Sequence, residues 1–277
     1  NDGKLVQRLR EGKRITVDTL ERIHAFLGDS APVPRPPEPP IERRDPRGNF
    51  RFFENRQKYL LFVHTCSEKR VIAQRVALEL GSIHPRPPAL RVFDAGMGDG
   101  TVLARVMRAM HGRFPHMPFY VAGKEISLED VRLTLDKVPD RLFEHPATVF
   151  VLTNMNYAEA PWLTPKSPAA AAGMIWREVA LTGNSSGDFE AQIAELEPFI
   201  EDNWRASVSP RSGMPVYERP VVIVLYREDH RFLLDSIIPR AGKVEANFDL
   251  VIASQPYRAK SSLNFRAKKI IAPLARA

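Results

Sequence analysis

Hydrophobic positions recur along this chain with two different periods, and the period changes near residue 90. Before that point apolar residues have helical spacing, over residues 1–30 and again over 50–82. After it, short apolar runs alternate with segments of helical spacing, a pattern typical of parallel strands joined by helical crossovers. The pattern therefore predicts a helical N-terminal part followed by an α/β domain.

Five apolar runs have the length and the β-branched content of buried strands. They are residues 90–95, 119–123, 148–152, 221–226 and 248–253. Segments of helical spacing lie at 101–111, 127–142, 229–237 and 265–277. Because helices separate most of these runs, we expect a mostly parallel sheet flanked by helices.

Two stretches interrupt this rhythm. Residues 31–48 are rich in proline, which has no backbone N–H and breaks helices, so we expect an extended linker there. Residues 161–218 combine an Ala-rich piece, a Gly/Ser/Asn turn and an acidic helical segment, which predicts a mainly helical insertion. The expected organisation is a helical appendage over 1–30, the linker, and an α/β domain over 49–277 that carries the insertion.

Composition limits the function classes without selecting one. Hydrophobic residues make up 44% and charged residues 26% of the chain, as in globular proteins, and no apolar run approaches the roughly 18 residues that a membrane span needs. We therefore expect a cytoplasmic protein with no membrane partner. The single cysteine, Cys66, excludes an internal disulfide, and no metal site is predicted. The net charge of +7, spread along the chain, favours anionic partners only weakly.

The strongest candidate for chemistry is the run Asp-Ala-Gly-Met-Gly-Asp-Gly at residues 94–100. It follows the first expected strand and opens a helix, where glycines permit unusual φ values and close approach of a ligand. Glu125 ends the second strand, where a carboxylate can accept the hydroxyls of a ribose. Asn154 and Asn156 follow the third, where they can read an adenine edge or serve only as turn residues. Ligands bind at this carboxyl edge in open α/β sheets.

Residues 92–100, Val-Phe-Asp-Ala-Gly-Met-Gly-Asp-Gly, resemble the glycine-rich motif of class I S-adenosylmethionine-dependent methyltransferases. Glu125 falls where that family holds the ribose, and residues 248–252 resemble its fourth-strand motif. The resemblance covers about residues 55–277 outside the insertion and implies a Rossmann-like fold with S-adenosyl-L-methionine as cofactor. The cofactor-binding residues it implies are Asp94, Ala95, Gly96, Gly98, Gly100, Glu125, Ile126, Asn154, Met155 and Ser254.

Two features depart from the family pattern. Asn154 or Asn156 stands where the family often has an acid after the third strand, which leaves the adenine contact undefined. The terminal strands of the family sheet, the fifth to the seventh, are not visible in the sequence.

The methyl acceptor is not identified by the sequence. Residues 254–257, Ser-Gln-Pro-Tyr, resemble imperfectly the Asn/Asp-Pro-Pro-aromatic motif of enzymes that methylate planar nitrogens, so Gln255 and Tyr257 are the candidate catalytic, acceptor-site residues. The leading hypothesis is methyl transfer to a small molecule or a protein, with nitrogen a candidate acceptor atom. One alternative is a nucleic-acid methyltransferase. Another is a non-catalytic, cofactor-sensing DNA-binding regulator, because residues 9–28 resemble the second half of a repressor-type helix-turn-helix.

The insertion leaves the third strand at the edge where the cofactor loops lie. Long loops at such an edge commonly act as lids or binding surfaces. We therefore expect the insertion and the aromatic segment 50–62 to wall the acceptor pocket, with Tyr59, Trp176 or Tyr257 lining it. The simpler alternative is that the insertion packs on the helical face and serves stability.

Overall fold

The computed structural model describes residues 67–210, 215–254 and 262–277. The chain forms two compact units, Asn1–Leu61 and Phe62–Ala277, and all described residues belong to the second unit. The expected appendage, the linker, the helix-turn-helix-like segment and the aromatic segment 50–62 lie outside the described residues, as do Gln255 and Tyr257.

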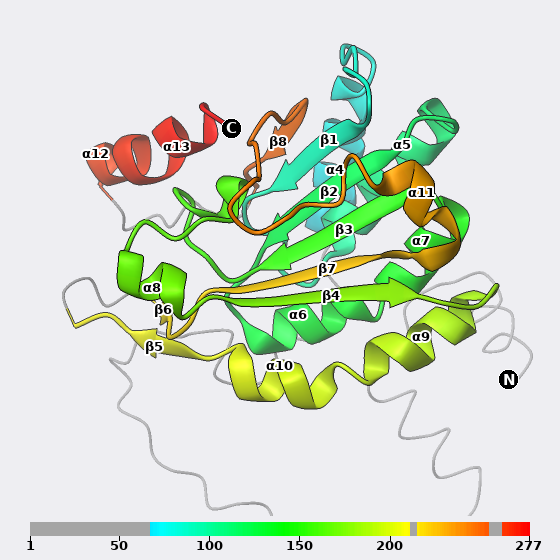
Figure 1. Cartoon of the computed structure of the whole chain (residues 1–277). Coiled ribbons are helices and arrows are strands. Elements are labelled where there is room, and N and C mark those ends of the chain that lie inside the picture. Colours follow the sequence, from blue (N-terminus) through cyan, green and yellow to red (C-terminus); the bar gives the residue numbers. More distant parts are fainter. Residues whose placement is uncertain (1–66, 211–214, 255–261) are drawn as a thin grey trace, which may run out of the picture. The chain divides into compact units, whose positions relative to one another are not determined.

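A six-stranded sheet with the order β4-β7-β3-β2-β1-β8 forms the centre of the second unit (Figure 1). Its strands are β1 (Leu90–Asp94), β2 (Phe119–Lys124), β3 (Thr148–Thr153), β4 (Ile175–Leu181), β7 (Val221–Arg227) and β8 (Leu250–Ile252). Strands β3, β2, β1 and β8 pair in parallel, and β4 pairs in parallel with β7. The β3–β7 pair is antiparallel. The predicted α/β fold with a mostly parallel sheet and flanking helices is confirmed.

The insertion differs from its prediction. Residues 161–218 were expected to be mainly helical, yet they supply the edge strand β4 and a separate hairpin of β5 (Ala206–Val208) and β6 (Pro215–Tyr217). Arg177 and Glu178 are exposed in the middle of β4. Charges of this kind are common on edge strands and obscure the apolar alternation by which a strand is recognised. The helices of the insertion are α8 (Pro168–Ala172), α9 (Ser186–Ala194) and α10 (Glu197–Asn203), after the short turn η2 (Ala160–Trp162).

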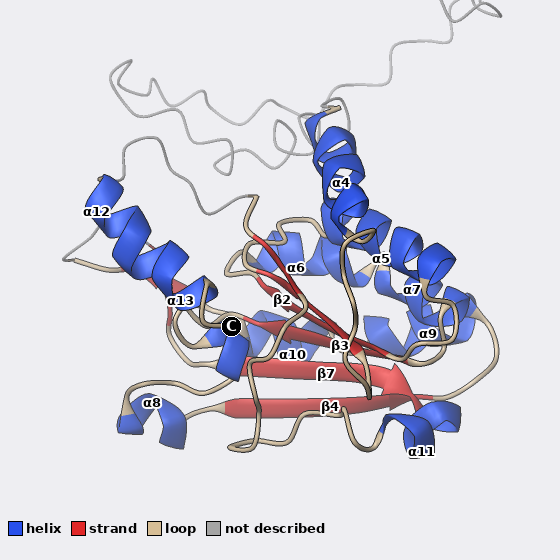
Figure 2. Ribbon diagram, turned by 90° about the horizontal axis from the view of Figure 1, so that it is seen from above, coloured by secondary structure: helices blue, strands red, loops and turns tan. Residues whose placement is uncertain are grey.

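Helices cover one face of the sheet densely. They are α4 (Glu68–Glu79), α5 (Thr101–Arg113), α6 (Leu128–Leu135), α7 (Val138–Glu144), α9 and α10. Figure 2 shows α4 to α7 and α9 on this side. The single helix expected over 127–142 is two helices, because the chain turns at residues 136–137 and Pro139 lies in the first turn of the next helix.

The other face is covered by residues 234–248 and by the C-terminal helical run. The run consists of α12 (Leu263–Arg266), a π-helical segment (Ala267–Ile271) and α13 (Ala272–Leu274). The helix expected over 229–237 is the short turn η3 (Glu228–His230) followed by α11 (Arg231–Leu234). No helix in the described part of the chain is long and apolar enough to cross a membrane.

Candidate functional site

The candidate site lies where the strand order reverses. β2 and β3 continue the sheet on one side of β1, whereas β8 lies on the other, so the loops after β1 and β8 leave the same edge in opposite directions. The Ala95 N–H donates to the Ile252 carbonyl at 2.8 Å and joins these two loops. Ligands bind at this point in open α/β sheets. Residues 94–100 and the half-buried Ser254 are thereby brought to one edge.

Gly98 and Gly100 of the loop and Gly123 of β2 have different structural roles. Gly98 and Gly100 have φ values of +54° and +74°, a region that favours glycine. A Cβ on Gly100 would lie 2.8 Å from Thr134 Oγ1, and a Cβ on Gly123 in β2 would collide with Met97 Sδ. A Cβ on Gly98, by contrast, would have no atom of the described residues within 4 Å. Gly100 and Gly123 are therefore required by packing, whereas Gly98 borders open space.

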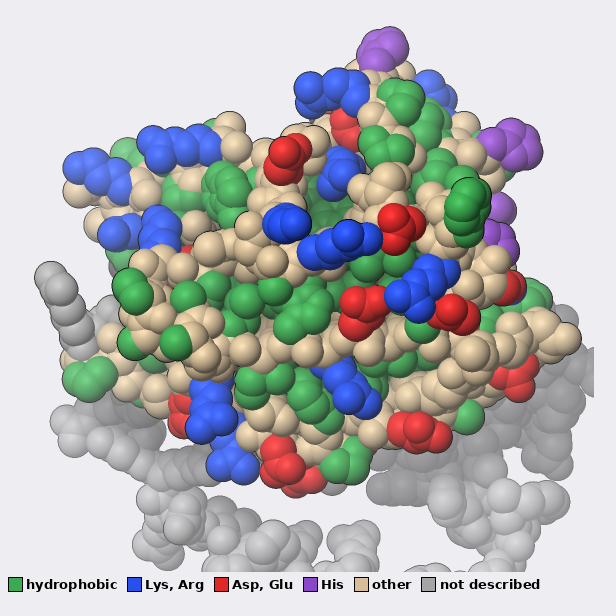
Figure 3. All heavy atoms as spheres, viewed as in Figure 1, with side chains coloured by type: hydrophobic (Ala, Val, Ile, Leu, Met, Phe, Trp, Pro, Cys, Tyr) green, Lys and Arg blue, Asp and Glu red, His purple; other side chains and the backbone are tan. Residues whose placement is uncertain are grey.

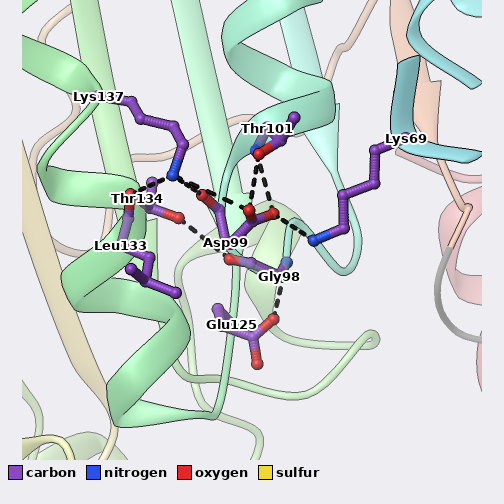
Figure 4. Close-up of polar contacts among 8 residues, drawn as sticks. All are labelled: Lys69, Gly98, Asp99, Thr101, Glu125, Leu133, Thr134 and Lys137. Atoms are coloured by element: carbon purple, nitrogen blue, oxygen red, sulfur yellow. Dashed lines mark hydrogen bonds and ion pairs between the residues drawn. The ribbon is translucent and has the colours of Figure 1, made fainter. Parts of the chain in front are cut away.

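Helix α6 and the turn that follows it hold the glycine loop, residues 94–100. Thr134 Oγ1 donates to the Gly98 carbonyl at 3.0 Å. Lys137 Nζ donates to the Asp99 carbonyl at 2.8 Å (Figure 4). Burial lowers the pKa of Lys137, and the charge of Asp99 opposes that shift. These bonds fix two carbonyl groups of the loop toward α6.

Asp99 fixes the loop to the helices on either side of it. Lys69, buried in α4, donates to Asp99 Oδ1 at 2.6 Å, and Thr101 Oγ1 donates to Oδ2 at 2.6 Å (Figure 4). Burial alone would raise the pKa of Asp99, but the hydrogen bonds from Lys69 and Thr101 outweigh it and lower that pKa. Asp99 is therefore an anchoring carboxylate whose hydrogen bonds are made within the chain.

Glu125 connects the end of β2 to the glycine loop. Its Oε2 accepts from the Gly98 N–H at 2.9 Å, and its Oε1 accepts from the N–H groups of Ile126 and Ser127 at 2.7 and 2.9 Å. A carboxylate oxygen can accept two hydrogen bonds, so Oε2 retains one acceptor position. Glu125 thus lies beside Gly98, as the sequence predicted, and Ile126 contributes its backbone.

Asp94 is fully buried beneath the glycine loop. Its Oδ1 accepts from the Gly96 N–H at 3.1 Å, whereas Oδ2 has no hydrogen-bond partner among the residues that the structure describes. Burial raises the pKa of Asp94 to about 7, against the Gly96 hydrogen bond and with a smaller contribution from the charge of Glu125. An unpartnered buried carboxylate is unfavourable, so the site would gain from a cationic group nearby.

The side chains of Asn154 and Met155 make contacts within the protein. The buried Asn154 side chain donates from Nδ2 to the Arg219 carbonyl and accepts at Oδ1 from the Val221 N–H, both at 2.8 Å. Its nitrogen and oxygen thereby hold the start of β7. Met155 is fully buried in the core on the face of the sheet that the C-terminal helical run covers. Asn156 is exposed and accepts from the Ala158 N–H at 2.9 Å, as expected of a turn residue.

A second polar cluster at this edge was missed by sequence reasoning. The buried Glu159 accepts from Tyr217 Oη at 2.9 Å, from Asn156 Nδ2 at 2.5 Å and from the Lys166 N–H at 2.8 Å. Burial and the Glu159 carboxylate raise the pKa of Tyr217 above its usual value. The only local signal is an acid shortly after the third strand, because Tyr217 is 58 positions away along the chain.

Trp176 does not lie near the glycine loop. It belongs to β4, which is four strand positions away from β1 and hence about 19 Å across the sheet. Trp176 therefore does not contact the glycine loop, and its proposed place in the acceptor pocket stays a prediction. Tyr59 and Tyr257, the other two residues named for that role, lie outside the described residues.

Comparisons with protein-family models, with curated proteins and with solved structures found no match to this chain.

Proposed function

We propose that this chain is an S-adenosylmethionine-dependent methyltransferase with a Rossmann-like α/β domain, and that the cofactor binds over residues 94–100. The observation that carries the proposal is the pairing of the open space at Gly98 with the unpartnered buried oxygen of Asp94. Glu125 lies beside both and retains one acceptor position for a ribose hydroxyl. The switch point between β1 and β8 is where such folds bind nucleosides.

The charge of the site favours this cofactor over a dinucleotide. S-adenosylmethionine carries a sulfonium and an ammonium group, and either cation would stabilise the ionised form of Asp94. A dinucleotide would bring its anionic pyrophosphate toward Asp94 and Glu125, which face the same loop. The negative charges of the pyrophosphate and the two carboxylates would repel one another. The burial of Asp94 strengthens this repulsion, because charges interact more strongly in the protein interior than in water.

Bound S-adenosylmethionine supplies an electrophilic methyl group. The chain's own contribution is positional: Lys69, Thr134 and Lys137 fix the glycine loop, so that the loop is already ordered when a ligand arrives. Gln255 and Tyr257 follow β8 in sequence and are the residues that we propose for the acceptor side. The acceptor itself is a small molecule, a protein or a nucleic acid.

Titration calorimetry with S-adenosylmethionine and with its demethylated product tests the proposal. Wild-type protein should bind both, and Gly98→Val should abolish binding by filling the space that the ligand needs. Gly242→Val is the matched control, because Gly242 has φ +74° and no described atom within 4 Å of an added Cβ. It carries similar backbone strain away from residues 94–100.

Unchanged binding by Gly98→Val would show that the site is misplaced. Wild-type protein that binds NADH and neither sulfur compound would overturn the proposed function.

A further inference from the structure

The last residues of this chain contain basic residues and no acidic ones. The whole chain has 40 Lys and Arg against 33 Asp and Glu, a net charge of 40 − 33 = +7. Residues 250–277 contain six Lys or Arg and no Asp or Glu, so the remaining residues have 34 against 33, a net charge of +1. The basic residues themselves are spread along the chain, as expected, and residues 250–277 differ in having no acidic residue.

The described part of this segment forms the C-terminal helical run, Leu263–Leu274. Ile270 and Leu274 are buried and attach the run to the core. Lys268, Lys269 and Arg276 are exposed. Figure 3 shows Lys and Arg side chains gathered over this part of the molecule. The run is therefore a rigid element that presents its cations to solvent.

Some exposed cations of the described surface pair with a carboxylate and others do not. Arg75, Arg108 and Arg240 each pair with a carboxylate, as is usual for a solvated face. For the cations of the helical run, no ion pair exists within the described residues. An unneutralised row of cations on one element is the electrostatic pattern of a surface that binds a polyanion.

Apolar side chains are exposed among the cations. Leu263, Phe265 and Ile271 have exposed fractions of 76%, 38% and 40%. Surfaces that bind single-stranded nucleic acids combine cations for the phosphates with aromatic side chains on which the bases stack, and Phe265 is such a side chain. An interfacial membrane helix instead needs a broad continuous apolar face. Here Ile270 and Leu274 face the core, so the pattern favours a nucleic acid over a lipid surface.

The helical run begins beyond the carboxyl edge of the sheet, the edge at which the candidate site lies. The Phe248 N–H donates to the Ala277 carbonyl at 2.8 Å, which places the chain end beside the start of β8. Figures 1 and 2 both place α12 beyond the carboxyl ends of β1 and β2. The run therefore extends from the carboxyl edge, where residues 94–100 lie, back along the face of the sheet.

We propose that the C-terminal helical run binds the phosphate backbone of a single-stranded nucleic acid and directs that strand to the carboxyl edge of the sheet. The further role of this nucleic acid as the methyl acceptor rests on the proposed function. The binding itself does not, because it depends only on the cations and apolar groups of residues 263–276.

Fluorescence anisotropy with labelled 20-nucleotide DNA and RNA strands tests the proposal on the full chain without cofactor. Lys268→Gln/Lys269→Gln should reduce the slope of log K against log salt by about 1.4 and weaken binding roughly tenfold at 0.15 M salt, because two phosphate contacts are lost. Arg86→Gln/Arg105→Gln removes the same charge from two exposed positions on other elements. This control should change the affinity less than twofold.

The proposal would be overturned by no binding by wild-type protein, by equal loss in both double variants, or by binding to phosphatidylserine vesicles and not to oligonucleotides. Unchanged binding in Lys268→Gln/Lys269→Gln would assign the contact to another segment and would also overturn it. Since no cofactor is present, each of these results leaves the calorimetric test of the proposed function independent.

Discussion

Strands β1, β2 and β8 run parallel to one another, whereas β7 and β4 run antiparallel to them, and the two groups use their polar side chains differently. At the ends of the parallel strands, Asp94 keeps an oxygen without a partner among the described residues, and Glu125 retains an acceptor position. Around β7 and β4, polar side chains satisfy one another: Tyr226 Oη donates to Glu178 Oε1 at 2.6 Å. The first region therefore has hydrogen-bond acceptors left for a ligand, whereas in the second region the polar side chains bond to one another.

Part of the insertion contributes to stability. Leu181, Phe189, Ile200 and Trp204 are buried in the core of the helical face, so the insertion completes that core and the edge of the sheet. Deleting residues 165–215 would remove β4 and expose this core. The deletion would unfold the protein and could not separate cofactor binding from turnover, so point substitutions are the informative tests.

The largest expected effect is on stability, from Phe189→Ala in α9. Truncating this fully buried ring should lower the free energy of unfolding by about 3–5 kcal/mol, through lost burial and the cavity left behind. Cofactor affinity of the folded protein should not change. Phe232→Ala is the control, because that ring is 99% exposed and its loss should be nearly neutral. Chemical denaturation and calorimetry measure both quantities, and a Phe189→Ala protein that is stable but no longer binds cofactor contradicts the comparison.

The next effect is pH-dependent and concerns Asp94. Its folded pKa of about 7 lies above the ordinary value of 3.8, so the stability it contributes is complete below pH 3.8 and is lost as pH rises to about 7. The difference of about 3 pKa units corresponds to a loss on the order of 4 kcal/mol. Asp94→Asn, which resembles the protonated acid, should match wild type near pH 4 and be more stable at pH 8.

Denaturation curves at several pH values check this prediction. Parallel pH profiles for the two proteins would mean that Asp94 titrates normally. A cationic ligand beside Asp94 favours the ionised form, so wild-type affinity for S-adenosylmethionine should rise with pH up to about 7. Asp94→Asn should lack this dependence.

A smaller effect distinguishes two carboxylates, Glu125 and Glu178. If Glu125 accepts a ribose hydroxyl, Glu125→Gln should weaken cofactor binding by about 1.5–3 kcal/mol, the scale of a hydrogen bond to a charged group. Glu178→Gln should leave affinity unchanged, because that carboxylate accepts from Tyr226 on β7. Calorimetry on both variants gives the comparison, and equal losses of affinity would show that the two regions are not functionally distinct.

The sequence predicted the parallel region better than the antiparallel one, for a physical reason. The loop at residues 94–100 and the acid Glu125 are local signals. Glycines at positive φ and a carboxylate at a strand end indicate a turn without any knowledge of distant parts of the chain. The partners of Asn154 are 65 and 67 positions away, at the start of a strand whose direction no local pattern reveals. Strand β4, with its exposed charges, could be recognised only once β7 was placed beside it.

The smallest expected effect concerns Tyr217, the residue that links the insertion to the loop after β3. Tyr217→Phe removes one hydroxyl from Glu159, which keeps its bonds to Asn156 Nδ2 and the Lys166 N–H. The expected loss is therefore only about 1 kcal/mol of unfolding free energy, with cofactor affinity unchanged. Tyr226→Phe, which removes the hydroxyl that donates to Glu178, is the matched control and should behave alike. If Tyr217→Phe instead reduces methyl transfer more than tenfold while Tyr226→Phe does not, the hairpin belongs to the acceptor site. The boundary between the two regions would then have to be drawn through the insertion, with β5 and β6 assigned to function and β4 to stability.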